Sequence, residues 1–445
     1  MKICRATETD LSAALRELSA KLGLGAGMVS ESSRRKTLDV FGEALSPLEV
    51  VRKILRDVRE RGDEAVAEYA RKLDGAALRP EAFRVTPEEI DAAWRSVPER
   101  FRESLSRAAE NIRRFQEHVK ARAPAPLRNA EGGAVAVEYR PLARVGIYVP
   151  ASLASTLLMT AVPAQVAGVP EIVVTTPCAP DGKPRAETLA AARVAGVSEV
   201  YRLGSVQAIA ALAYGTKTIR RVDKIVGPGN LFVTLAKREV YGEVDLDLLA
   251  GPSEVLIIAD GGADPRFAAA DLLSQAEHDP AAAVLLTPDE RVARETLAEI
   301  GRQLPKLSRE KAARDCIERY GFIGVTRDLD QAVELANQFA PEHLELAVAE
   351  PEALLPRIRA AGAVFLGQYT PEPVGDYLAG PSHVLPTGGT ARFFSGLSVN
   401  DFLRSMSVIR YSESALKKSV ADIESLARAE GLDAHARAAG IRFEK

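Results

Sequence analysis

Apolar residues recur every three or four positions through the first 120 residues, which is the spacing of one face of a helix. One such series is Leu48, Val51, Leu55 and Val58. It follows Ser46-Pro47, where serine can cap a helix and proline fits the first helical position. Thr86 and Glu89 have the spacing of a capping box and indicate a second helix start. We therefore expect this part of the chain to be helical.

From Val145 the pattern changes to short apolar runs separated by helical stretches. The runs predict strands at Val145–Val149, Glu171–Thr176, Glu199–Leu203 and Asp223–Val226. The stretches between them predict helices at Ser155–Ala167, Arg185–Ala195 and Val206–Tyr214. Strands that alternate with helices are typical of right-handed βαβ units in a parallel sheet.

A second set of the same kind begins after Gly251-Pro252-Ser253. It predicts strands at Glu254–Ala259, Val284–Thr287, Phe322–Val325 and Val364–Leu366, and helices at Pro265–Glu277, Glu290–Gln303 and Leu329–Gln338. A helical tail is expected from about Leu397. The predicted fold class is α/β, with two Rossmann-like parallel-sheet domains of incomplete doubly wound form and small helical segments at both ends.

Composition narrows the class of protein. The 445 residues are 47% hydrophobic and 27% charged, which is the balance of a globular protein. The net charge of -3 does not favour nucleic acid or an acidic lipid surface as a partner. Three widely separated cysteines indicate neither a disulfide framework nor a thiolate metal site. No run of ~18 apolar residues is present, so we expect no membrane span and a cytoplasmic location.

Two short motifs could carry chemistry. Gln275 and His278 stand three apart on one helix face, where they could offer an oxygen and a nitrogen to a divalent metal. Glu342-His343 places an acid beside a base after a proline that should end a helix, and histidine is a proton carrier near neutral pH. The first motif also fits a histidine stabilised by the helix dipole, and the second also fits a polar loop.

Three further places are candidates. Asp376 lies in a glycine-rich turn, and Glu430 and His435 stand five apart in the tail. Each of these also fits a turn or a cap. The segment 227–230 joins a predicted strand to a helix at the carboxyl edge of the first sheet, where α/β proteins bind ligands.

Several long blocks, in order along the chain, resemble histidinol dehydrogenases. They are VDKIVGPGN (222–230), AGPSEVLIIAD (250–260), ADLLSQAEHDP (270–280), APEHLELAV (340–348), PEPVGDYLAGPSHVLPTGGTARF (371–393) and the E-x4-H of the tail (430–435). The resemblance covers nearly the whole chain, from about Asp39 to its end. It implies a dehydrogenase that oxidises L-histidinol to L-histidine through L-histidinaldehyde, with two NAD, in the last steps of histidine biosynthesis.

The resemblance also implies roles for single residues. Zinc, one ion per subunit, would be held by Gln275, His278, Asp376 and His435. In the family this tail histidine comes from the neighbouring subunit, so a homodimer with shared sites is expected. Glu342 and His343 would be the acid–base pair. Substrate contacts would be made by Ser253, Gln275, His278, His343, Asp376, Glu430 and His435, and cofactor contacts by Tyr148, Gln207 and Asn230.

These roles suggest a division of the chain. Residues 1–30 form an N-terminal helical segment, and 31–147 with 255–396 form the main α/β domain, which carries the metal and acid–base residues. Residues 148–254 form the second α/β domain on the cofactor side, and 397–445 form a helical tail that reaches the partner subunit.

The resemblance departs in one place. After Tyr148-Val149-Pro150 the family usually has two glycines and a longer loop, whereas this chain has the shorter segment 151–156 without that pair. Two alternatives therefore remain open. One is an NAD-dependent dehydrogenase of another polar alcohol. The other is a metal-dependent hydrolase or a metal-binding protein that no longer uses NAD.

Overall fold

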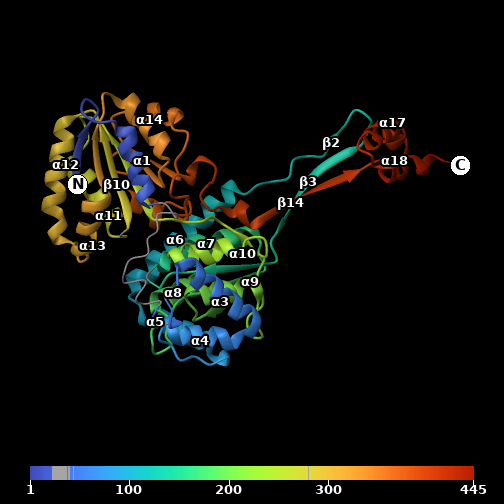
Figure 1. Cartoon of the computed structure of the whole chain (residues 1–445), viewed down its shortest axis with the longest axis horizontal. Helices are drawn as coiled ribbons and strands as arrows, with labels where there is room; N and C mark the ends of the chain where they lie inside the picture. The colour runs from blue at the N-terminus through green and yellow to red at the C-terminus, as the bar shows by residue number, and fades with distance from the viewer. Residues whose placement is uncertain (23–37, 39–40, 44, 152, 279, 445) are drawn as a thin grey trace.

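The computed structural model describes residues 1–22, 38, 41–43, 45–151, 153–278 and 280–444. Two parallel β-sheets, each covered by helices, form the body of the molecule, and a narrow arm that ends in two helices extends away from it (Figure 1). The predicted α/β class with two parallel sheets is confirmed. Within the described ranges, no helix combines the length and the apolar character that crossing a membrane requires.

The five-stranded sheet contains the first predicted set of strands. In spatial order these are β6 (Glu199–Tyr201), β5 (Glu171–Thr175), β4 (Arg144–Tyr148), β7 (Lys224–Val226) and β8 (Asp245–Leu246), all parallel. The helices between them are α7 (Ala154–Ala167), α8 (Ala186–Val194), α9 (Ser205–Tyr214) and α10 (Leu231–Val240). The chain reverses its direction of progress between β4 and β7, which makes their carboxyl ends the topological switch point of this sheet.

The six-stranded sheet contains the second predicted set. Its order is β1 (Lys2–Arg5), β11 (Gly321–Val325), β10 (Ala281–Thr287), β9 (Ser253–Ala259), β12 (His343–Ala347) and β13 (Ala363–Leu366), again all parallel. One face is covered by α11 (Pro265–Ala276), α12 (Glu290–Gln303) and α13 (Glu310–Tyr320), and the other by α1 (Leu11–Leu22) and α14 (Leu329–Phe339). Strand β1 was not predicted, so the N-terminal segment is not purely helical.

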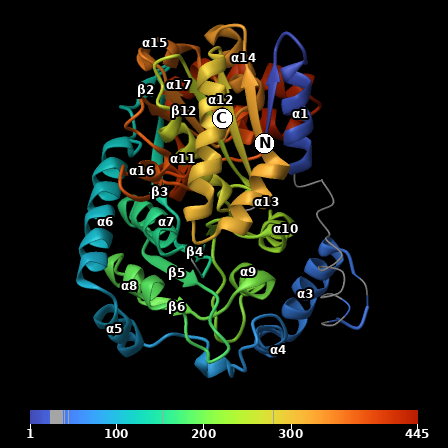
Figure 2. The ribbon, with the colours of Figure 1, turned by 90° about the vertical axis from the view of Figure 1, so that its left-hand side faces the viewer.

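The N-terminal helices are α3 (Pro47–Arg61), α4 (Asp63–Leu73), α5 (Pro87–Ser96) and α6 (Glu99–Val119). Both predicted capping boxes form: the hydroxyl of Ser46 accepts from the Glu49 amide (3.3 Å), and the hydroxyl of Thr86 accepts from the Glu89 amide (3.3 Å). All four helices pack on the five-stranded sheet (Figure 2). The grouping of 31–147 with 255–396 is therefore wrong for these helices, because their apolar faces meet the other core. The predicted boundary near residue 30 lies outside the described residues.

The arm is an antiparallel sheet that joins distant parts of the chain. It consists of β14 (Leu403–Arg410), β3 (Ala134–Pro141) and β2 (Leu127–Arg128), followed by α17 (Glu413–Ala429) and α18 (Asp433–Gly440). The tail from Leu397 was predicted to be helical, but it also contains strand β14. Its first part, with Val399 and Phe402, packs into the core beside α6 and α7, and β14 then pairs with β3 along eight residue pairs.

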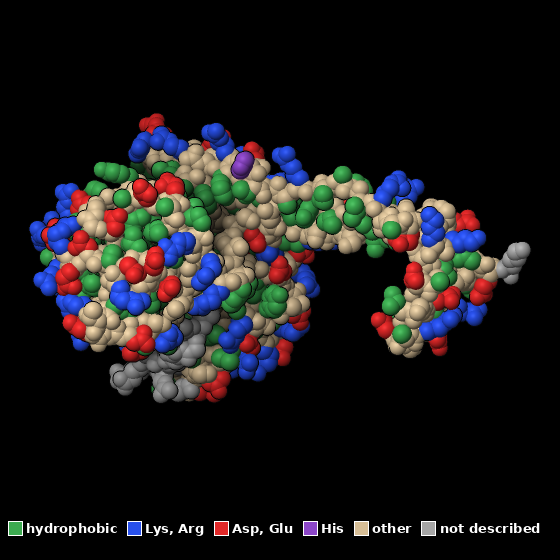
Figure 3. Space-filling view, turned by 90° about the horizontal axis from the view of Figure 1, so that it is seen from above, with side chains coloured by type: hydrophobic (Ala, Val, Ile, Leu, Met, Phe, Trp, Pro, Cys, Tyr) green, Lys and Arg blue, Asp and Glu red, His purple; other side chains and the backbone are tan. Residues whose placement is uncertain are grey.

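The arm carries exposed apolar side chains. Figure 3 shows it projecting from the body with hydrophobic side chains along its length. Ile409 is 70% exposed and Leu426 is 69% exposed. Helix α17 has 17 residues, yet it buries only Ala415 and Ala427. A helix with so little buried surface has few contacts to stabilise its place in an isolated chain.

Candidate active site

The predicted acid–base pair lies at the amino-terminal ends of β9 and β12. His343 is the first residue of β12, which pairs with β9 on one side and β13 on the other. Helix α11 returns from the carboxyl end of β9 to the amino end of β10, so its last turn, with Gln275, lies at the same edge. Parallel sheets usually bind ligands at their carboxyl ends. In the six-stranded sheet the predicted site residues lie at the opposite, amino-terminal edge.

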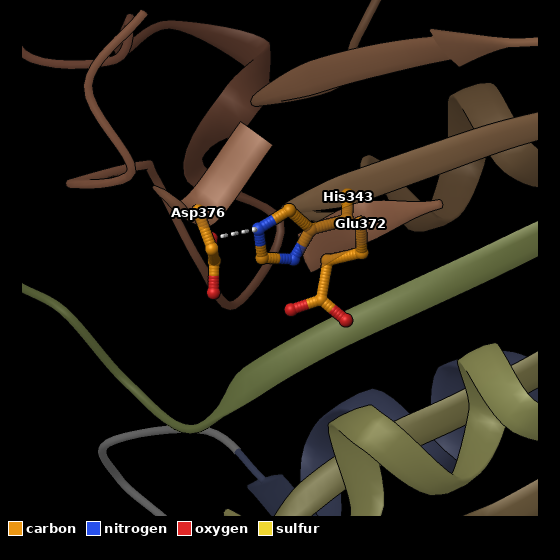
Figure 4. A group of neighbouring side chains, drawn as sticks. All are labelled: His343, Glu372 and Asp376. Atoms are coloured by element: carbon orange, nitrogen blue, oxygen red, sulfur yellow. Dashed lines mark ion pairs between the residues drawn. The ribbon is translucent and has the colours of Figure 1, made fainter. Parts of the chain in front are cut away.

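One ring nitrogen of His343 is hydrogen-bonded, and the other faces a carboxylate at a longer distance without a hydrogen-bond partner among the described residues. Nδ1 lies 3.1 Å from the carbonyl oxygen of Glu254, and Nε2 lies 3.7 Å from Oδ1 of Asp376. Since a carbonyl oxygen only accepts hydrogen bonds, Nδ1 carries the hydrogen that it donates. The other nitrogen points toward Asp376, with the carboxylate of Glu372 nearby (Figure 4). The side chain is almost fully buried, so these groups determine its protonation.

Burial and charge act in opposite directions on this pair. Desolvation works to lower the pKa of His343, but the negative charges of Glu342, Asp376 and Glu372 outweigh it and raise the pKa to about 10. Desolvation raises the pKa of Glu342 to about 7, although the imidazole of His343 opposes the rise. Nδ1 of His343 lies 3.7 Å from Oε2 of Glu342. A buried acid and base in such proximity can hold and transfer protons near neutral pH.

Gln275 and His278 lie at the end of α11, beside this pair. Gln275 is fully buried, and neither its side-chain oxygen nor its nitrogen has a hydrogen-bond partner among the described residues. The preceding Ser274 donates from Oγ to Oε2 of Glu372 (3.0 Å), which holds the end of α11 against α16 (Glu372–Tyr377). Desolvation lowers the pKa of His278, and the charge of Asp376 opposes this effect. An unpaired amide oxygen, an imidazole and a carboxylate are donors that a divalent metal accepts.

Glu372 belongs to this site, although the sequence analysis did not single it out. One ligand atom from each of His343, Glu372 and Asp376 lies within 4.8 Å of the others (Figure 4). Of these three, only Asp376 was predicted as a metal ligand. Glu372 and Asp376 stand four apart in the sequence, and that i, i+4 spacing was the available signal, because it places both carboxylates on one helix face.

His383 connects the site to the other half of the body. Its Nδ1 lies 3.0 Å from the carbonyl oxygen of Asp376, and its Nε2 lies 3.1 Å from Oγ1 of Thr156 at the start of α7. Desolvation lowers the pKa of this buried imidazole. The predicted substrate residue Ser253 lies at the same edge, as the first residue of β9. The amino edge of the six-stranded sheet thus faces the carboxyl edge of the five-stranded sheet.

The predicted cofactor residues lie at that carboxyl edge, but in different environments. Tyr148 ends β4 and is 4% exposed, and its hydroxyl accepts from the amide of Ser205 (3.4 Å). Gln207 is fully buried and donates from Nε2 to Asp74 (2.9 Å), while its Oε1 has no hydrogen-bond partner among the described residues. Asn230 is exposed and caps α10, where Oδ1 accepts from the amide of Val233 (3.2 Å).

The comparisons with known proteins agree with this geometry. Residues 43–443 match the family model described as histidinol dehydrogenase. The chain belongs to the histidinol dehydrogenase family. The family resemblance predicted from the sequence is thereby confirmed, and the protein is an oxidoreductase.

Individual relatives extend over almost the whole chain. The histidinol dehydrogenase of Heliobacterium mobile is 51% identical over 417 residues, which are 93% of this chain and 96% of the relative. That of Rhodopirellula baltica is 48% identical over 435 residues, 97% of this chain and 94% of the relative. The crystal structure of the Elizabethkingia anophelis enzyme matches with a TM-score of 0.89 at 34% identity, and covers 99% of this chain and 98% of that one.

The departure from the histidinol dehydrogenase pattern coincides with a hollow. A cavity of about 340 Å³ lies between the segment after β4 and helix α16. Small side chains of Ala151 and Ala154 line one wall, and Tyr377 and Leu378 line another. Helix α6 contributes Leu105 and Ala108. The cavity therefore lies where α6 and α7 of one half of the body meet Tyr377 and Leu378 of the other.

The tail residues expected from the histidinol dehydrogenase family do not join the site of their own chain. Glu430 caps the end of α17, and His435 lies in α18. Both helices lie at the far end of the arm, away from α11 and the other elements of the site (Figure 1). Within one chain, the structure therefore brings together Gln275, His278, Asp376 and the acid–base pair, but not the two tail residues.

Proposed function

We propose that the protein oxidises L-histidinol to L-histidine through L-histidinaldehyde and reduces two NAD per substrate molecule. The observation that carries the proposal is the placement of His343 between Glu254 and Asp376, with Glu342 at 3.7 Å, in a chain of this family. It supplies a proton carrier whose tautomer is fixed and a second carboxyl group whose pKa is near neutral. Together these groups can take up the protons that are released when an alcohol is oxidised beyond the aldehyde.

His343 acts in each of the two oxidations. Because Nδ1 donates to a carbonyl oxygen, Nε2 is the nitrogen that can accept the hydroxyl proton of the alcohol. As that proton leaves, the carbon bearing the hydroxyl transfers a hydride to NAD, which gives the aldehyde, NADH and a proton on His343. For this role the imidazole must first lose its own proton, so positive charge close to Asp376 favours activity by reducing the effect of that carboxylate on the pKa.

Glu342 acts between the oxidations. Its carboxylate takes a proton from water as the water oxygen bonds to the aldehyde carbon, and His343 returns the proton of the first oxidation to the aldehyde oxygen, which gives the hydrated aldehyde and frees His343 to act again. His343 then accepts a proton from one of the two hydroxyls of the hydrate, and a second hydride passes to a second NAD to give the carboxylic acid. Each oxidation removes two electrons, so four are transferred in total. Retaining the aldehyde at one buried site protects it from side reactions.

We also propose a zinc site formed by Gln275, His278 and Asp376 of one chain and His435 of another. The fit is supported by the buried amide oxygen of Gln275, which lacks a partner within the described part of the chain, and by a donor set of imidazole, carboxylate and amide oxygen. The ion, when bound, supplies a fixed positive charge that orients the imidazole and amine of the substrate. Ser253 and Glu430 would contact the same substrate.

The position of the tail supports a homodimer as part of the same proposal. The arm carries Glu430 and His435 away from the site of their own chain, and α17 buries only two alanines. A second copy of the chain could cover the apolar arm and receive these residues in its own site. Two-fold symmetry would then give two equivalent sites, each formed by the body of one chain and the tail of the other.

The decisive experiment measures NADH absorbance with limiting L-histidinol, with zinc present and after treatment with a chelator. Two NADH per histidinol, and loss of activity that zinc restores, are expected. A ratio of one would indicate a dehydrogenase that stops at the aldehyde. Consumption of histidinol without NADH would support the hydrolase alternative and refute the proposal. The same assay with other polar alcohols tests the remaining alternative.

A further inference from the structure

A buried ion pair lies directly beneath the turn at the carboxyl end of β7. Lys237 on α10 is paired with Asp247, which follows β8, and their side chains are only 3% and 1% exposed. An ion pair is expensive to bury, because both charges lose their hydration. General stabilisation of the fold therefore does not explain why this ion pair is buried here.

The pair holds both backbone polar groups of one residue, Gly227. The amide of Gly227 donates to Oδ2 of Asp247 (2.6 Å), and the carbonyl oxygen of Gly227 accepts from Nζ of Lys237 (3.0 Å). Asp247 also accepts from the amide of Leu248 through Oδ1 (2.6 Å). The two charges thus fix the turn that begins at Gly227 in one orientation.

The turn requires glycine at position 227. Gly227 has φ of +108°, a region that favours glycine. A Cβ at this position would collide with the carbonyl oxygen of Tyr148 on the neighbouring strand. Three residues later, Asn230 caps α10 through the amides of Phe232 and Val233. The path from Gly227 to Asn230 is therefore fixed at both ends.

We infer that Lys237 and Asp247 are positioning residues for the dinucleotide, and that they act by fixing the turn 227–230 at the switch point between β4 and β7. The inference rests on the proposed NAD-dependent function. It is favoured by the place of the turn, because open parallel sheets bind nucleotides outside the carboxyl ends of the strands at that point.

Asp247 also begins the segment that connects the five-stranded sheet to the six-stranded sheet. Oγ1 of Thr234 on α10 donates to the carbonyl oxygen of Ala250 (3.0 Å), and the amide of Gly251 donates to Oγ1 of Thr387 (2.5 Å). Ser253 begins β9 two residues later. The segment from Asp247 to Ser253 thus links the fixed turn to the substrate side, so a displaced turn would change the distance between the two reactants.

The test separates positioning from stability. In the variant Lys237→Met/Asp247→Asn both charges are removed, while the asparagine keeps an oxygen that can accept from Gly227. The matched control is Arg144→Met/Glu199→Gln. Arg144 of this pair is buried, with its side chain 7% exposed, and Glu199 is 22% exposed. Arg144 also contacts Glu171, and all three residues lie toward the amino edge of the same sheet, far along the strands from the turn.

The measurements are NADH affinity by fluorescence titration of the zinc-loaded enzyme, KM for NAD and for histidinol, and the urea midpoint. We expect the Lys237/Asp247 variant to bind NADH about ten-fold more weakly, the loss caused by one misplaced hydrogen-bonding group, with the KM for histidinol within about two-fold of the parent. The control should lose stability and keep its NADH affinity.

Two results would overturn the inference. One is NADH affinity of the Lys237/Asp247 variant equal to that of the parent. The other is an equal loss in the control, which would mean that any loosening of this sheet weakens binding. Failure of the parent enzyme to bind NADH at all is a different outcome, because it refutes the proposed function and the inference together.

Discussion

Replacing Gln275 with methionine should make the metal-free protein more stable. Gln275 is fully buried, and its amide oxygen and nitrogen have no hydrogen-bond partner within the described residues. Methionine has nearly the same shape but no polar atoms to desolvate. The substitution should therefore remove a cost that the folded protein carries only because the amide serves a ligand.

The expected size follows from the cost of burying an amide without partners, which is about 1–3 kcal/mol in mutational data. The free energy of unfolding of chelator-treated Gln275→Met should rise by that amount. With zinc the order should reverse. A ligand present at about 100 times its Kd stabilises the folded state by about 2.7 kcal/mol, and the variant has lost one oxygen donor and should gain less.

Urea unfolding followed by tryptophan fluorescence and circular dichroism, with and without zinc, measures both effects. Gln116→Met is a control, because Gln116 is equally buried and its Nε2 likewise has no partner among the described residues, but its Oε1 accepts from the amide of Val399 (2.8 Å), which the substitution would leave unpaired. That variant should be less stable by about 1–3 kcal/mol under both conditions. A chelator-treated Gln275→Met protein less stable than the parent would refute the reasoning, since it would mean that the amide is satisfied within the fold.

Three further predictions concern the charged groups. His343→Asn should lower kcat by about 10²–10⁴-fold with zinc content unchanged, and a parental rate would exclude His343 as the base. Burial raises the pKa of Glu254 from 4.5 to about 8, so the parent loses stability as pH rises through this range. Glu254→Gln should therefore flatten the dependence of the free energy of unfolding on pH. An unchanged pH profile in urea titrations would contradict this expectation. His435→Asn should lower zinc content, and coexpression of His343→Asn and His435→Asn chains should restore about a quarter of the parental activity, because half of the dimers are mixed and each has one intact site. No recovery would argue against shared sites.

Strands β1, β8 and β12 were not predicted, but the other strands of both sheets and most of their helices followed from local patterns, because each buries a regular apolar face. The arm did not. All eight residues of β3 are exposed or only partly buried, so no alternation of burial marks the strand, and its partner β14 lies more than 260 positions later. Periodicity also shows which face of α3 is apolar but not which sheet covers it, and for this reason the helices before Val145 were grouped with the wrong core.

The site could be predicted only in part, for a similar reason. The i, i+3 and adjacent motifs placed Gln275, His278 and the Glu342-His343 pair, since short spacings fix geometry. The support of His343 by the carbonyl oxygen of Glu254 is a backbone contact across two strands, which side-chain identity does not encode. The cofactor contact of Gln207, which the family resemblance implies, stays a prediction, and the fold buries the side chain with Nε2 donating to Asp74.

The arm has a kinetic consequence. Phe402, just before β14, lies in the core of the body, so the arm is anchored there. If two copies bind each other through such arms, each arm must leave the other chain before the two bodies can separate. Subunit exchange between finished dimers should then be far slower than ordinary dissociation. Mixed dimers would form during synthesis or refolding, and combining two purified variants would leave both populations unmixed.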